Sequence, residues 1–172
     1  FFFLKRDLAD RLSAAARAHR VSLMILLLAA CQLAQARWSG MRDVLSAAYT
    51  ADRVKPQFHN TVGMLVTNMP VRSRIAPEAS LGAFLGDLSR AYYGGYAHRE
   101  LSCELYEAVF APPSPFFATV FNFVPQQKGA SDNNPFAVST FEGIRTTPDA
   151  SRPAIYREIY LGLSQHPAGL LG

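Results

Sequence analysis

Apolar residues in the first forty positions recur with the period of a helix. Between Lys5 and Arg20 they return every three or four residues with charged side chains between them, which predicts an amphipathic helix. Ser22 is suited to cap a second helix that runs to about Trp38, because its hydroxyl can accept from a free backbone N–H. The following Ser39-Gly40 pair is expected to end that helix.

Short runs of apolar and β-favouring residues mark the predicted strands. They are Phe1–Leu4, Asp43–Thr50, Met64–Val71, Phe116–Val124, Phe136–Phe141 and Ala154–Leu163. Polar or proline-rich loops separate several of them, notably Asp52–Asn60, 112–115 and Lys128–Asn134. The last five residues, Ala168–Gly172, are apolar but are expected to add no closing element.

A third helix is expected to open at Pro77 and Ser80. Its buried stripe comprises Leu81, Phe84, Leu85, Leu88, Ala91 and Tyr92. Gly94-Gly95 should loosen its end, and Ser102 could cap a short helix over Cys103–Phe110. Helices first, followed by alternating helices and strands, predict an α/β or α+β layered fold.

The most apolar stretch, Val21–Ala34, is predicted to be a core helix. Its unbroken run, Leu23–Cys31, is far shorter than the roughly 20 residues of a membrane span. The chain begins without Met and shows no signal peptide, so we expect a piece of a longer polypeptide.

Composition narrows the function classes. Of 172 residues, 49% are hydrophobic and 17% charged, which fits one domain or lobe with an apolar surface for another lobe.

The net charge of +4 is spread over scattered arginines, which argues against nucleic-acid binding. Cys31 and Cys103 form no CxxC motif, so no metal site is predicted. We interpret Cys31 as a small core residue and expect a reducing, cytoplasmic setting.

Four segments, in order, carry a resemblance to a known family. Residues 37–53 (RWSGMRDVLSAAYTADR) are similar to "sgqdDvvvGtpvanR", with Asp43 and Arg53 in register. Residues 62–72 (VGMLVTNMPVR) resemble "IGxFVNTLPLR", and residues 98–105 (HRELSCEL) resemble "HQDxPFEKL". Residues 114–122 (SPFFATVFN) resemble "NPLFQVMFN". Together they resemble the C-terminal half of a nonribosomal-peptide-synthetase condensation domain, in the chloramphenicol-acetyltransferase-like superfamily.

The resemblance implies a fold and an activity. The fold would be an α/β two-layer sandwich lobe with a mixed sheet and flanking helices, and residues 1–172 would form the C-terminal lobe. The family joins two carrier-bound acyl groups when an amine, or sometimes an alcohol, attacks a thioester. Its catalytic histidine lies in an HHxxxDG motif of the N-terminal lobe, whereas the histidines here, His19, His59, His98 and His166, are never adjacent. We therefore expect this chain to be inactive alone.

The resemblance also implies site residues and partners. Thr67 and Asn68 would support catalysis; Gly63, Met64, Arg72 and Asn122 would line the substrate tunnel or contact the other lobe. No cofactor or metal would be bound directly, and the phosphopantetheine arm of carrier proteins would arrive as substrate. The partners would be the N-terminal lobe and peptidyl carrier proteins, with no nucleic acid and no membrane.

Departures from the family pattern keep alternatives open. The family's Asn-Thr pair is reversed as Thr67-Asn68, and only one of the two can face the tunnel because side chains alternate along a strand. Ser102 and Cys103 replace the family's Pro and Phe. A non-catalytic recruiter of carrier proteins, or an acyltransferase using coenzyme A or carrier thioesters, is therefore an alternative function.

Single polar residues also have structural interpretations. Arg72 could be an exposed or ion-paired arginine rather than a lobe contact, and His98 a capping or packing residue rather than a base. The sequence around Ser102 and Ser114 does not favour a hydrolase triad. Lys128–Asp149 matches the place where the family extends toward its other lobe.

Overall fold

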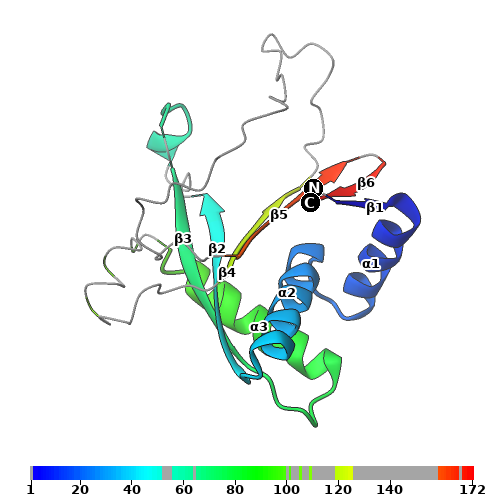
Figure 1. The fold of residues 1–172 in the computed structure, drawn as a ribbon. Coiled ribbons are helices and arrows are strands. Elements are labelled where there is room, and N and C mark those ends of the chain that lie inside the picture. Colours follow the sequence, from blue (N-terminus) through cyan, green and yellow to red (C-terminus); the bar gives the residue numbers. More distant parts are fainter. Residues whose placement is uncertain are drawn as a thin grey trace, which may run out of the picture.

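In its described part, the computed structural model contains a six-stranded sheet and three helices (Figure 1). It describes residues 2–51, 56–63, 65–99, 101, 105, 109, 119–125, 159–166 and 168–172. In chain order the elements are β1 Phe3–Lys5, α1 Arg6–Ala18, α2 Leu23–Ser39, β2 Asp43–Ala51, a 3-10 turn Pro56–Phe58, β3 Val66–Arg74, α3 Leu81–Tyr96, β4 Thr119–Val124, β5 Ile159–His166 and β6 Gly169–Leu171.

The sheet is mixed, as the resemblance implied. Its spatial order is β1-β6-β5-β4-β2-β3. The central pairs β2/β4 and β4/β5 are parallel, whereas β2/β3, β5/β6 and β1/β6 are antiparallel. Parallel neighbours need long crossover connections, so the centre of the sheet joins segments far apart in sequence.

All three helices gather on one side of the sheet (Figure 1). The main core lies between them and the strands, where Leu28 of α2 and Leu85 of α3 pack with Val71 and Phe121 of the sheet. We call the opposite surface of the sheet the outer face. A second, small cluster on that face consists of Ala47 and Val120, with the half-buried Leu45 against them.

The helix ends follow the predicted signals. Ser22 accepts a hydrogen bond from the Ile25 N–H at 3.2 Å, and Ser80 accepts from the Ala83 N–H at the same distance. Gly40 ends α2 with a φ of 71°, a left-handed conformation that glycine adopts without a Cβ penalty. Both N-terminal caps and this C-terminal stop are confirmed.

The apolar α2 is a core helix, as predicted. Residues 25–29 and Gln32 are all buried, and the Gln32 amide donates to the carbonyl of Val71 on β3 at 3.0 Å. In the described part of the chain, no single helix is long and apolar enough to cross a membrane; α1 and α2 meet the criterion only as a pair bent by 100°.

Several predicted details were wrong. The tail forms β6, which pairs with both β1 and β5, because its backbone completes a sheet that the local sequence does not reveal. Leu81 and Ala91 are exposed, since they lie off the stripe of α3 that faces the core, and α3 runs through Gly94-Gly95 to Tyr96. Cys31 is only half-buried at the edge of the core, where burial raises the pKa of its thiol.

Boundaries of the strands also shifted. β3 begins two residues later than predicted and continues to Arg74, and β5 extends to His166. The predicted helix over Cys103–Phe110 and strand over Phe136–Phe141 lie outside the described residues, except for Leu105 and Val109. So do the loop Lys128–Asn134, the whole 128–149 region and Met64.

Candidate functional site on the outer face of the sheet

Strand register separates Thr67 from Asn68. In the β2/β3 pair, Thr67 lies opposite Thr50 and Asn68 lies opposite Tyr49. Met69 and Val71 belong to the core beneath the helices. Since side chains alternate along a strand, Thr67 lies on the helix side and Asn68 on the outer face.

Asn68 presents an unsatisfied acceptor. Its Oδ1 is buried and has no hydrogen-bond partner in the described part of the chain. A buried polar atom without a partner costs about 1–3 kcal/mol, so such atoms are uncommon and often mark functional positions. A ligand or a companion segment with an N–H or O–H group would satisfy it.

Tyr49 lies between Asn68 and Asn122 on this face, and Tyr160 lies beyond Asn122 on β5. Tyr49, beside Asn68, meets the ring of Tyr160 on β5 with a centroid distance of 5.9 Å and an interplanar angle of 56°. The Nδ2 of Asn122 on β4 donates to the Tyr160 hydroxyl at 3.0 Å. The four side chains, from four different strands, thus form one row across the outer face, which we call the Asn-Tyr row.

An open groove of about 520 Å³ begins at the Tyr160 end of this row. The polar groups of Asn122, Tyr160 and Ser164 line it together with the apolar side chains of Phe2, Val124 and Leu171. Ligand sites typically combine mostly apolar walls with a few placed polar groups, and this groove has that composition.

Gly162 makes room for the Tyr160 ring. A Cβ at Gly162 would lie 2.9 Å from Cε1 of Tyr160, closer than side-chain carbons normally approach. The glycine therefore lets the ring lie over β5 and reach Asn122 on the neighbouring strand.

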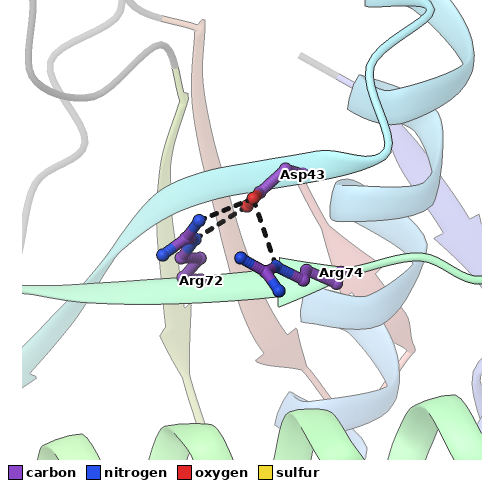
Figure 2. Close-up of polar contacts among 3 residues, drawn as sticks. All are labelled: Asp43, Arg72 and Arg74. Atoms are coloured by element: carbon purple, nitrogen blue, oxygen red, sulfur yellow. Dashed lines mark hydrogen bonds and ion pairs between the residues drawn. The ribbon is translucent and has the colours of Figure 1, made fainter.

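Arg72 lies on the same face but is engaged in an ion pair (Figure 2). Its Nε and Nη2 donate to the two oxygens of Asp43 at 2.8 and 2.6 Å, and Arg74 Nε donates to Oδ2 at 3.4 Å. The hydrogen bonds from Arg72, aided by the positive charges of both arginines, lower the pKa of Asp43 from 3.8 to about 2, although desolvation of the carboxyl opposes this. The interpretation of Arg72 as an exposed, ion-paired arginine is confirmed.

The remaining candidates lie apart from the Asn-Tyr row. Gly63 is exposed in the loop before β3, and a Cβ added there would meet no described atom within 4 Å. Met64 is outside the described residues. His59 is exposed in a loop and His98 is exposed just after α3. Among the described side chains no three of His, Cys, Asp or Glu gather as a metal site would require.

Sequence reasoning missed Tyr49, Tyr160 and Gly162. Tyr49 lies inside the first quoted motif, and its alternation with the buried Ala48 and Thr50 was a usable signal for the outer face. Tyr160 could not be placed, because its neighbours come from the parallel β4/β5 pairing.

Comparison with a family model identifies a match over most of the chain. The family model described as "Condensation domain" matches residues 1–153. This range includes β1 to β4 and three of the four side chains of the Asn-Tyr row.

Relatives are long synthetases. The chain is 26% identical to tyrocidine synthase 2 of Brevibacillus parabrevis over 175 residues, covering 98% of the chain and 5% of that protein. It is 31% identical to N-(5-amino-5-carboxypentanoyl)-L-cysteinyl-D-valine synthase of Amycolatopsis lactamdurans over 103 residues, which is 60% of the chain and 3% of that protein. The chain therefore spans only a small part of each relative.

Solved structures share the fold. The first condensation domain of the CDA synthetase superposes with a TM-score of 0.73 at 20% identity, covering 98% of this chain and 37% of that one. The condensation domain of the Monacolin K polyketide synthase MokA gives a TM-score of 0.67 at 21% identity, over 74% of this chain and 31% of that one. The α/β fold with a mixed sheet and flanking helices is confirmed.

Proposed function

Because the chain belongs to the condensation-domain family, we propose that it is the C-terminal lobe of an enzyme that joins two carrier-bound thioester substrates. The bond formed would be an amide or an ester in nonribosomal peptide biosynthesis. The observation that carries this proposal is the family match over residues 1–153, together with a sheet face that holds an unsatisfied amide and an open groove.

Asn68 is the side chain that we assign to the reaction. An attacking amine must present its lone pair to the thioester carbonyl, and an acceptor for one of its N–H groups fixes that orientation. The buried Oδ1 of Asn68 has no partner among the residues that the structure describes and could accept from the amine or from the imidazole of the companion lobe. Asn68 would be a positioning residue, whereas Thr67 would only support the strand from the helix side.

The companion groups would come from outside this chain. The general base or positioning histidine would lie in an HHxxxDG motif of the N-terminal lobe, and carrier proteins would deliver both substrates on phosphopantetheine arms. The setting that we propose for the enzyme is a reducing, cytoplasmic one. Gly63, Met64 and Asn122 are kept as tunnel or lobe contacts, with Arg72 contributing only through its ion pair with Asp43.

The test is a condensation assay on the intact polypeptide that carries this chain. We expect an HHxxxDG motif upstream and product formation that is lost when its second histidine is replaced by alanine. Asn68→Ala should lower kcat by about 10- to 100-fold, the cost of one lost hydrogen bond to a reacting group. Thr67→Ala, the neighbour on the other face, is the matched control and should change kcat by less than about threefold.

Absence of product with every carrier-bound substrate pair, from a polypeptide that does contain the motif, would contradict the proposal. The 172-residue chain alone should show no turnover, and turnover by it would contradict the assignment of this chain as a partner lobe.

A recruiter of carrier proteins is the second candidate, favoured by the reversed Thr67-Asn68 pair. It predicts capture of carrier proteins by the intact polypeptide without bond formation. An acyltransferase that accepts coenzyme A thioesters would instead turn over those donors as well as carrier thioesters, and a side-by-side donor comparison separates the three functions.

A further inference from the structure

We propose that the groove on the outer face holds the apolar acyl group of a thioester substrate, and that Tyr160 sets the size of the group it accepts. This inference rests on the proposed function and deepens it, because it assigns a specificity-determining residue to one substrate. Neither the sequence motifs nor the family match singles out Tyr160, which lies beyond residues 1–153.

The dimensions of the groove favour a small molecule. Its volume of about 520 Å³ falls in the range of ligand sites, whereas a stable protein interface would need a much larger surface. Phe2, Val124 and Leu171 line it, and each exposes close to half of its side chain. An aliphatic or aromatic acyl group would cover these surfaces.

The position of the Tyr160 ring is fixed from two sides. Asn122 on β4 donates a hydrogen bond to its hydroxyl. Because Gly162 has no side chain, the ring can lie over that position. Its ring also contacts Tyr49 across the face. Although 55% of Tyr160 is exposed, its ring therefore forms a defined wall of the groove.

The hydroxyl of Tyr160 adds a polar anchor. Because it accepts from Asn122, its own proton is left to donate, and the described residues show no acceptor for it. A thioester carbonyl at the groove mouth would take this hydrogen bond while the acyl chain lies along Val124 and Leu171. The ring should therefore determine the size of the acyl group that binds, whereas the hydroxyl should determine the affinity for every acyl group.

The experiment is photoaffinity labelling of the intact polypeptide that carries the chain. The probe is a pantetheine thioester of a hexanoyl chain with a terminal diazirine. Labelled peptides are identified by mass spectrometry, and competition by unlabelled hexanoyl- and 2-naphthylacetyl-pantetheine gives their relative affinities. We expect label within 119–125 and 159–172.

Three variants separate the roles of Tyr160. Tyr160→Ala should shift the competition ratio toward the naphthylacetyl thioester by about tenfold, the usual discrimination of an apolar pocket. Gly162→Ala should displace the ring and shift the ratio in the same direction. Tyr160→Phe should weaken both competitors equally without changing their ratio. Tyr93→Ala is the matched control, since Tyr93 is 52% exposed on α3, away from the outer face, and its variant should leave the ratio unchanged.

The outcomes distinguish this inference from the proposed function. Label elsewhere in the polypeptide, or an unchanged ratio in Tyr160→Ala, overturns the inference even when condensation is observed. Label in the groove and a shifted ratio without any condensation product uphold the inference and overturn the proposed function. Protection of the groove from the probe by a protein partner, with no competition by either thioester, identifies a docking surface and also overturns the inference.

Discussion

On the outer face of β2 and β3, one carboxylate meets two guanidinium groups, while the buried oxygen of an amide has no partner among the described residues. Asp43 is satisfied by Arg72 and Arg74, all within one strand pair. Asn68 lies on the same face of the same pair and has no donor for its Oδ1 among the described residues. The sequence named both Arg72 and Asn68 as candidates, and the hydrogen-bond partners separate a self-contained ion pair from a group open to a ligand.

Arg72→Ala tests the ion pair. The folded pKa of Asp43 is about 2, below its ordinary 3.8, so the pair stabilises the fold above pH 3.8 and the effect is lost as pH falls through about 2. Without Arg72 the pKa of Asp43 should rise toward 3.8, with Arg74 retaining part of the shift. A carboxyl NMR titration measures it. Arg90→Ala, which removes the partner of Asp87, is the control; an unchanged Asp43 pKa in Arg72→Ala would contradict the assignment.

At the scale of elements, helix ends were predictable because their signals are local. A serine before each of α2 and α3 caps the next turn through a contact three residues away, and Gly40 stops α2 by its own backbone conformation. Periodicity placed the helices to within one or two residues for the same reason.

Strand faces were less predictable because they depend on register. The motif over 62–72 located β3, yet only pairing with β2 decides that Asn68 and not Thr67 reaches the outer face. Tyr160 joins Asn122 through the parallel pairing of β4 with β5, a contact between distant segments that no local pattern encodes. Of the four side chains of the Asn-Tyr row, the sequence therefore predicted Asn68 and Asn122 and missed Tyr49 and Tyr160.

Ser22→Ala tests the cap of α2. Loss of the bond to the Ile25 N–H should lower the free energy of unfolding by about 1 kcal/mol. Ser13→Ala is the control, because the Ser13 hydroxyl bonds back to the Ala9 carbonyl inside α1 and its loss should change stability by less than about 0.5 kcal/mol. Urea unfolding measures both; equal effects of the two variants would contradict the capping role.

At the scale of the whole molecule, the two ends of the chain close the sheet together. β1 and β6 pair at its edge, and Phe2 and Gly172 exchange two backbone hydrogen bonds of 2.9 Å (Figure 1). The tail was expected to add no closing element, because its five residues show no strand pattern of their own. Its structure depends on two partner strands that only the folded chain brings together.

Two adjacent leucines of β6 lie on opposite faces of the sheet, and replacing each in turn separates the role of the core from that of the groove. Leu170 is fully buried beneath α1 and α2, whereas Leu171 is 46% exposed and lines the groove. Leu170→Ala should lower the free energy of unfolding by about 2–5 kcal/mol, the cost of a cavity in a packed core. Leu171→Ala should cost less than about 1 kcal/mol but should weaken labelling by the hexanoyl probe. Urea unfolding and photolabelling of both variants measure the contrast. If Leu171→Ala destabilised the fold as much as Leu170→Ala, the outer face would be part of the core of this lobe, and the groove would not be a surface kept open for a substrate.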